Sequence, residues 1–252
     1  MAHQNGMTVF SITDHDIVKD VTFAKKYASS LGMTFIPGVE LSTLHQNKSV
    51  HVLGYFKNDG YKSAAMNDYY KMIKEGRENR ARQFIKNLKQ YYEIEITYES
   101  VLSFSRGIIA RPHIGKAINQ AYPEYSFDYI FDHFIGDYSE AYVPSTQLPV
   151  EEGVKLLRNN GAIAVLAHPT LLKKHIKEEV LAMDFDGIEA RYYRNLKNEE
   201  ELYRKYALEN RIIITAGSDY HGIENDSKHG TVGEVYIEGT DLNAFLDALK
   251  EN

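Results

Sequence analysis

Short apolar runs alternate with longer amphipathic stretches along most of this 252-residue chain. Apolar runs bounded by Gly, Pro or polar residues are typical of buried strands, whereas apolar residues spaced three or four apart indicate helices. The runs that predict strands are residues 8–13, 35–41, 50–56, 162–167, 187–190, 212–217 and 233–237. Because strands that alternate with helices usually form parallel βαβ units, the pattern predicts an α/β fold.

Helices are predicted between these strands, over residues 17–31, 149–160 and 199–210. Gly32 and Gly161 follow the first two of them. Glycine commonly ends a helix because it adopts left-handed backbone angles without steric strain, so both positions support the predicted helix ends.

The rhythm changes between residues 61 and 142, a Tyr-rich segment with a helical pattern and no strong apolar strand. We predict an inserted, mainly helical subdomain over residues 61–142, with residues 1–60 and 143–252 forming a barrel domain. The helix predicted over residues 71–89 carries a basic face, formed by Lys71, Lys74, Arg77, Arg80, Arg82, Lys86 and Lys89. Such a face is usually an ordinary solvated helix surface; the alternative is an arm that attracts a phosphate-rich substrate.

Composition narrows the possible chemistry. The chain has no cysteine, which excludes disulfides and thiol nucleophiles and leaves His, Asp and Glu as the strong metal ligands. A net charge of −6 argues against a surface that coats nucleic acid generally. No signal-like N-terminus and no apolar run near the roughly 18 residues of a membrane span occurs. We therefore expect a soluble, cytoplasmic protein with no membrane partner.

Six side chains of metal-ligand type fall inside or just after the predicted strands. They are His15, Glu40, His51, His168, Asp219 and His221. The carboxyl ends of the strands of a parallel barrel meet at one face, so we expect the six to converge there. Any one of them alone would be better explained as a hydrogen-bonded structural residue, but their coincidence favours a metal site.

The first of these residues has carboxylates on both sides. Asp14 and Asp16 flank His15, so one of them could orient the imidazole or share a metal. Asp16 is also well placed to cap the helix predicted from residue 17, and we expect it to do so. Glu40 has no apolar role in a buried strand, so its burial would require a cation or a hydrogen-bonded partner.

The later residues suggest the same chemistry. Taken alone, His51 could equally be a core histidine, while His168 stands at the end of an apolar strand. Asp219 and His221 are two residues apart, so an extended backbone would aim both at one cation. Histidines and carboxylates without thiolates suit Mn²⁺, Zn²⁺ or Fe²⁺, and so many ligands indicate more than one ion. Water activated by such ions would be the nucleophile of phosphate ester hydrolysis.

A second constellation lies in the segment ARPHIGKA, where Arg111 and His113 flank Pro112. Proline suits the first turn of a helix, and arginine, histidine and helix N-terminal amides all donate hydrogen bonds to phosphate. A surface helix with incidental charge is the alternative, but beside a phosphoesterase site we favour substrate phosphate binding. We assign no role to the remaining histidines, which are His3, His45, His133, His175 and His229.

The ordered segments TDHD, GVELS, HVLGY, ARPHIGKA, LAHP, GIEA and GSDYHG together resemble the PHP family, named for polymerase and histidinol phosphatase. The resemblance covers residues 6–222 and is greatest to small bacterial phosphoesterases that act on nucleotides or short RNA. It implies a distorted, TIM-like (β/α)7 barrel with an inserted helical subdomain, two or three divalent ions in a complete site, and residues 233–237 outside the barrel. The implied metal ligands are His15, Glu40, His51, His168, Asp219 and His221. Of these, Asp219, His221 and His168 are the expected catalytic residues, while Arg111 and His113 match a phosphate-binding motif.

The sequence also departs from that family. Its members open with a strand that bears a His-x-His pair, followed by an Asp and a helix, and this sequence starts at the helix. We therefore expect one strand and three ligands to be absent, leaving an unpaired gap between residues 8–13 and 212–217 and an incomplete metal site. On this interpretation the chain is a shortened product.

The resemblance predicts a phosphoric ester hydrolase, similar to a nucleoside bisphosphate phosphatase or a 5′-3′ exoribonuclease, that uses metal-activated water. A histidinol-phosphatase-like phosphomonoesterase is one alternative, and a truncated, catalytically impaired phosphate-binding module is another. An accessory domain of a polymerase is disfavoured, since no further catalytic domain accompanies the barrel. The exact substrate, the metal and the oligomeric state stay open.

Overall fold

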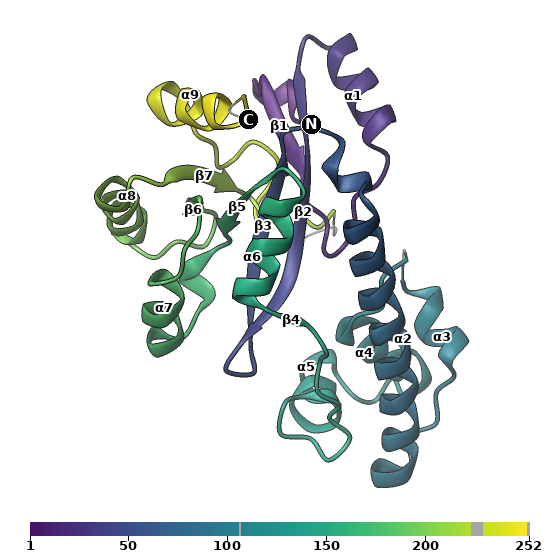
Figure 1. The fold of residues 1–252 in the computed structure, drawn as a ribbon. Helices are drawn as coiled ribbons and strands as arrows, with labels where there is room; N and C mark the ends of the chain where they lie inside the picture. The colour runs from purple at the N-terminus through teal and green to yellow at the C-terminus, as the bar shows by residue number, and fades with distance from the viewer. Residues whose placement is uncertain (106, 223–228, 251–252) are drawn as a thin grey trace. The chain divides into compact units, whose positions relative to one another are not determined.

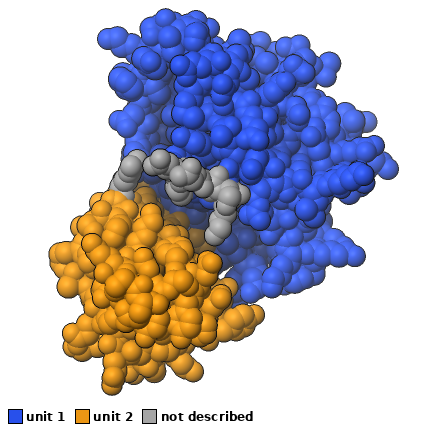
Figure 2. Space-filling view, turned by 180° about the vertical axis from the view of Figure 1, so that it is seen from behind, with its two compact units in different colours: residues 1–67, 148–252 blue, residues 68–147 orange. Residues whose placement is uncertain are grey.

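The computed structural model describes residues 1–105, 107–222 and 229–250 (Figure 1). The chain divides into two compact units, which Figure 2 colours separately. The first unit comprises residues 1–67 and 148–252, and the second comprises residues 68–147. The second unit shares residues 68–142 with the predicted insertion.

The first unit is built on a mixed sheet. Its strands are β1 (Val9–Ile12), β2 (Thr34–His45), β3 (Lys48–Phe56), β4 (Leu148–Pro149), β5 (Ala162–Leu166), β6 (Gly187–Tyr192) and β7 (Ile213–Gly217). The strand order is β1-β2-β3-β5-β6-β7, and β4 pairs with β2 away from this path. The pairs β1/β2, β2/β4, β5/β6 and β6/β7 are parallel, whereas β3 runs antiparallel to both β2 and β5.

The prediction of parallel βαβ units is therefore wrong at β3, which is antiparallel to both of its neighbours. Gln46 and Asn47 form a two-residue connection between β2 and β3, and both have positive φ, 47° and 60°. Two residues with positive φ are the pattern of a type I′ turn, which joins antiparallel strands in a tight hairpin. The apolar pattern of a fully buried strand carries no information about its direction, and the turn residues held the only local signal.

A second correction concerns residues 233–237, which were predicted to form a strand. Residues 233–235 form a turn and a bend instead, and residues 236 and 237 have no regular structure. Gly233 has a φ of 86°, and the Glu234 carboxylate accepts hydrogen bonds from both the backbone N and the Oγ1 of Thr231. This local turn therefore uses hydrogen-bonding groups that a strand would offer to a neighbouring strand.

The helices of the first unit are α1 (Val21–Ser30), α6 (Val150–Asn159), α7 (Lys174–Leu181), α8 (Glu199–Asn210) and α9 (Gly239–Ala248). Short 3-10 turns occupy His3–Asn5, Asp59–Lys62 and Pro169–Leu171. Gly32 and Gly161 adopt φ values of 69° and 70° after α1 and α6, as expected for helix ends. In the part of the chain that the structure describes, no helix is both long enough and apolar enough to cross a membrane.

The helix predicted from residue 17 begins only at Val21, so Asp16 does not cap it. Asp16 is fully buried with a φ of 55°, and its Oδ1 accepts a hydrogen bond from the backbone N of Ser42 at 2.8 Å. Its backbone N donates to the carbonyl of Glu40 at 2.9 Å. The Asp16 side chain therefore ties the segment after β1 to β2, a tertiary role that a local capping pattern cannot predict.

The two faces of the sheet are covered by different helices. Gly54 of β3 lies against Leu157 of α6, since a Cβ at residue 54 would stand 2.4 Å from Leu157 Cδ2. The neighbouring Leu53 and Tyr55 point to the opposite face, where they join a buried cluster with Phe245 of α9. Alternation along β3 thus separates an α6 face from an α9 face, and Figure 1 shows α6 lying across β2 and β3.

The second unit is helical in its regular structure. Its helices are α2 (Ala64–Tyr92), which belongs to this unit from residue 68, α3 (Tyr98–Ser103), α4 (Arg111–Ala121) and α5 (Phe127–Ile130), followed by a π-helical turn over Phe131–Ile135. Its core includes the fully buried Phe84, Leu88, Ile118, Ile130 and Ile135. This unit therefore has a hydrophobic core of its own.

Candidate functional site

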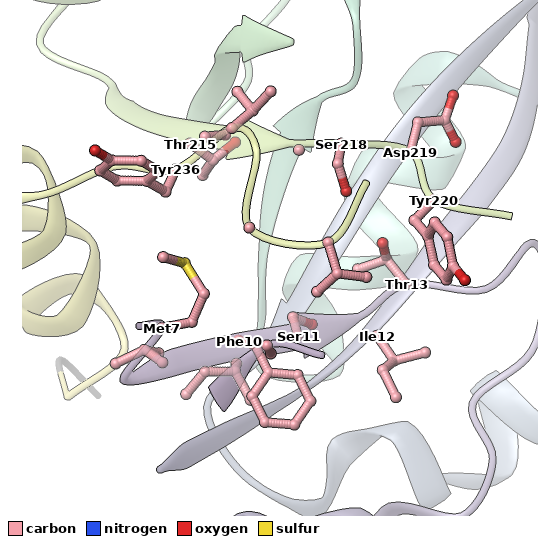
Figure 3. Close-up of a pocket in the computed structure, with 18 of the residues that line it drawn as sticks. Met7, Phe10, Ser11, Ile12, Thr13, Thr215, Ser218, Asp219, Tyr220 and Tyr236 are labelled. Carbon is pink, nitrogen blue, oxygen red and sulfur yellow. The ribbon is translucent and has the colours of Figure 1, made fainter. Parts of the chain in front are cut away.

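A cavity of about 920 Å³ opens in the first unit between β1 and β7. Figure 3 shows residues 10–13 on one side of it and Thr215, Ser218 and Asp219 on the other. Among the described residues, β1 and β7 are the two ends of the strand order and share no ladder, so the cavity lies where the sequence predicts an unpaired gap. Five of the predicted ligands contribute to its lining, namely His15, Glu40, His168, Asp219 and His221.

The carboxylate of Glu40 is the centre of a cluster of histidines. Its Oε1 lies 2.7 Å from His51 Nδ1 and 2.9 Å from His168 Nε2, and its Oε2 lies 3.5 Å from His15 Nδ1. His51 and His168 also approach each other, with 3.2 Å between Nδ1 and Nε2. Glu40 is only 6% exposed, so three imidazoles surround a carboxylate that is shielded from water, and those of His51 and His168 lie within hydrogen-bond distance of it.

The sheet explains how residues so far apart in sequence meet. His15 follows β1 and forms an isolated parallel bridge with Glu40, which lies within β2. His168 follows β5, as expected for a residue at the carboxyl end of a parallel strand. His51 lies near the start of β3, opposite Ser42 of β2, and reaches the same edge because β3 is antiparallel.

The electrostatics of this cluster favour positive charge beside Glu40. Burial raises the pKa of Glu40, but the charges of His15 and His51 and the hydrogen bonds from His168 and His51 bring it well below its usual value. Burial lowers the pKa of His168, but its hydrogen bond and charge interaction with Glu40 raise it to about 9. The buried carboxylate is therefore ionised at neutral pH and is stabilised by the protonated imidazole of His168.

Asp219 and His221 lie next to this cluster, just beyond β7. Nε2 of His221 is 3.0 Å from Oδ1 of Asp219, and the Tyr192 hydroxyl donates to Oδ2 at 2.9 Å. The His15 ring centroid lies 4.8 Å from that of His51 and 6.4 Å from that of His221, so His15 connects the two groups. Burial raises the pKa of Asp219, but the hydrogen bonds from His221 and Tyr192 leave it lower than usual.

Backbone conformation is unusual at three residues of this region. Asp16, His168 and Asp219 have φ values of 55°, 26° and 52°, which residues other than glycine rarely adopt. Such conformations persist where surrounding contacts hold them, and they concentrate at functional sites.

Sequence reasoning missed a buried carboxylate beneath the site. Glu189 of β6 is 5% exposed and accepts a hydrogen bond from the backbone N of His168 at 2.9 Å. Gly217 provides the space for it, since a Cβ there would stand 2.0 Å from Glu189 Oε1. Burial raises the pKa of Glu189 to about 7. An acidic residue inside the otherwise apolar segment GIEA was the signal that could have found it.

Two further residues missed from sequence contact Asp219. Tyr192, at the end of β6, orients the carboxylate through the hydrogen bond described above. Nε2 of His229 lies 4.0 Å from Asp219 Oδ2, and its ring stacks on His221. His229 follows no predicted strand, so no sequence pattern connected it with the site.

Arg111 and His113 lie together at the start of α4 in the second unit. Nη1 of Arg111 is 2.6 Å from Asp137 Oδ1, and its guanidinium carbon lies 5.7 Å from the Tyr142 ring centroid. The backbone N of Ala110 donates to His113 Nδ1 at 3.0 Å, so neutral His113 carries its proton on Nε2 and can donate there. Burial, together with the charges of Lys116 and Arg77, lowers the pKa of His113 and favours this neutral form.

The structure thus brings six of the eight predicted site residues together in the first unit, and the other two together in the second. His15, Glu40 and His51 form a donor set suited to a cation, since one ligand atom from each lies within 4.8 Å of the others. A second such group contains Asp219, His221 and His229.

Comparison with known proteins points to phosphoesterases. No family model matches the chain. It is 26% identical over 220 residues to the 5′-3′ exoribonuclease Rnm of Salmonella typhimurium, covering 84% of this chain and 74% of that protein. It is 24% identical over 222 residues to the 3′,5′-nucleoside bisphosphate phosphatase of Chromobacterium violaceum, covering 84% of this chain and 76% of that protein.

Among solved structures, the chain is similar to a protein of Bifidobacterium adolescentis described as a metal-dependent phosphoesterase. The TM-score is 0.80 at 22% identity, over 98% of this chain and 88% of that one. At this identity the likeness shows the fold alone. It confirms an α/β fold, while the predicted count of seven β/α units stays a prediction.

Glu189 should make the stability of the metal-free chain depend on pH. A carboxyl whose folded pKa is raised to about 7 favours folding below its ordinary pKa, and this contribution is lost as the pH rises through about 7. In EDTA, the free energy of unfolding should therefore contain a fall of about 2 to 3 kcal/mol between about pH 5 and pH 7.5 that Glu189→Gln removes. Urea unfolding of both proteins at the two pH values measures it. Glu152→Gln, at an exposed carboxylate of α6, is the control, and an E189Q profile parallel to that of the unmodified chain would contradict the assignment.

Proposed function

We propose that this chain is a metal-dependent phosphoesterase that hydrolyses phosphate esters of nucleotides or short RNA. The observation that carries the proposal is the buried Glu40 carboxylate with three histidines around it, at the edge of a cavity of about 920 Å³. That volume is in the range of small-molecule sites. The relatives include an exoribonuclease and a nucleoside bisphosphate phosphatase, which supports a nucleotide-like substrate.

The first unit would bind divalent ions through the six converging residues. His15, Glu40 and His51 would form one part of the site, with His168 joined to it through Glu40, and Asp219 and His221 would form the adjoining part. Nitrogen and oxygen donors without thiolates fit Mn²⁺, Zn²⁺ or Fe²⁺. Such ions, when bound, lower the pKa of a water molecule and neutralise phosphoryl oxygens.

The side chains around the ions would position them and move protons. Glu189 holds the backbone at His168, and Tyr192 holds Asp219, so the positions of two proposed ligands are set by buried partners. Asp219 in turn orients the imidazole of His221, which lines the cavity. His168 would keep its proton at neutral pH before an ion replaces it, because Glu40 raises its pKa to about 9.

Arg111 and His113 would bind the phosphate of the substrate. A guanidinium presents two parallel donors to phosphate, and Nε2–H of His113 adds a third. Burial lowers the pKa of the nearby Arg80, and the charge of Arg111 lowers it further, which indicates closely spaced positive charges in the second unit. A substrate phosphate that replaced the Asp137 carboxylate at Arg111 would balance these positive charges.

Glu40→Gln tests the metal-dependent part of the proposal. Gln keeps the shape of the side chain but removes the charge, so hydrolysis in Mn²⁺ should fall by at least about 100-fold, measured as phosphate released from a monoester or mononucleotide released from an oligoribonucleotide. The substrates are a nucleoside 3′,5′-bisphosphate, a 5′-phosphorylated oligoribonucleotide and histidinol phosphate, and Glu152→Gln is the matched control.

We expect the two nucleotide substrates to be hydrolysed much faster than histidinol phosphate. Preference for histidinol phosphate would overturn the substrate assignment. Binding of nucleotide with no metal-dependent release of phosphate or mononucleotide from any of the three substrates would contradict the enzymatic function itself.

Arg111→Lys tests the phosphate-binding part. Lysine keeps the charge but loses the bidentate geometry, so KM for the nucleotide substrate should rise about 10-fold with kcat nearly unchanged. Steady-state kinetics beside Arg204→Lys, a change at an arginine that pairs with Asp241, provide the comparison. Equal KM values for the R111K and R204K proteins would rule out phosphate binding by Arg111.

A further inference from the structure

Asp219, His221 and His229 form a group of ligand-type side chains that is separate from the group around Glu40. One ligand atom from each lies within 4.8 Å of the others. The two carboxylate oxygens of Asp219 face different imidazoles: Oδ1 is 3.0 Å from His221 Nε2, and Oδ2 is 4.0 Å from His229 Nε2. The two imidazole rings stack with 3.9 Å between their centroids.

These separations suit ligands of one ion. Two donors that each lie about 2.1 Å from a tetrahedral zinc-type ion are about 3.4 Å apart. The separation of Asp219 Oδ1 from His221 Nε2, 3.0 Å, is shorter than this value, and that of Asp219 Oδ2 from His229 Nε2, 4.0 Å, is longer. Rotation of the stacked imidazoles would turn both nitrogens towards one ion. The side chains of Asp219, His221 and His229 are 19%, 35% and 23% exposed, which leaves them accessible to an ion from solvent.

Gly230, the residue after His229, anchors the backbone and so holds His229 in this position. The backbone N of Gly230 donates to the carbonyl of Ser218 at 2.8 Å, next to Asp219. Gly230 is buried against Tyr193, and a Cβ at residue 230 would stand 2.9 Å from the tyrosine ring. His229 is therefore anchored beside the end of β7, where Tyr192 also fixes Asp219.

We propose that Asp219, His221 and His229 bind one divalent transition-metal ion, and that His229 is a metal ligand of this chain. The inference rests on the proposed function for Asp219 and His221, and it adds the third protein ligand. Three protein ligands leave a tetrahedral ion one open position, as in catalytic rather than structural sites. The site would therefore be one at which a phosphate oxygen can bind.

The absence of cysteine from the sequence permits a direct test with Co²⁺ as the probe. In a His229→Cys variant, the only thiolate of the protein would lie at the proposed ligand position. Coordination of Co²⁺ by that thiolate should produce an intense near-ultraviolet charge-transfer band that saturates with one equivalent of ion. His133→Cys, at an exposed histidine of the second unit, is the matched control and should give no such band.

Loss of the His229 ligand should weaken the binding of one of the ions and leave the binding of the other unchanged. In Co²⁺ titrations of the full chain followed by visible absorption, His229→Ala should weaken one binding phase by at least about 10-fold, while His51→Ala should weaken the other. Circular dichroism and urea unfolding in EDTA verify that each variant is folded.

The outcomes separate this inference from the function on which it rests. A titration of His229→Ala that overlays that of the unmodified chain, with no charge-transfer band in His229→Cys, would overturn the role of His229 while leaving the site around Glu40 intact. No binding of Co²⁺ by the unmodified chain would overturn both proposals.

Discussion

The arrangement of this molecule depends on one buried carboxylate, Glu40, and on the imidazoles that surround it. Moving an ionised carboxylate out of water costs several kcal/mol unless it is paired, and here His15, His51 and His168 supply the partners from three other segments. The strands that carry these segments must adopt their observed order for the charges to meet. The cluster therefore links the sheet topology to the chemistry of the cavity.

Further buried residues hold the histidines around Glu40 in position. The buried Asp16 ties the segment that carries His15 to β2, and Glu189 holds the backbone of His168. Positive φ values at Asp16, His168 and Asp219 show that the chain adopts unfavourable backbone conformations in this region. Contacts that compensate such strain are what keep ligand side chains in place before an ion binds.

Much of the fold and of the candidate site could be predicted from sequence, for specific reasons. The strands with buried apolar runs, and the ligand-type residues that interrupt or follow them, were visible because a charged side chain has no other role in such a place. The direction of β3 was not visible, since a fully buried strand looks the same in both directions. The role of Asp16 depends on a contact with Ser42, 26 residues away, and that of His229 on the anchoring of Gly230 by Ser218. Neither contact leaves a local pattern.

The most direct test of a cation site at Glu40 is anomalous X-ray diffraction from crystals of the full chain grown with Mn²⁺ and, separately, with Zn²⁺. The account predicts an anomalous peak within coordination distance of a Glu40 oxygen and of a nitrogen of His15 or His51, at about 2.0 to 2.2 Å. Well-ordered crystals in which Glu40 keeps its contacts with the three histidines, with no anomalous peak near it at saturating metal, would contradict the account.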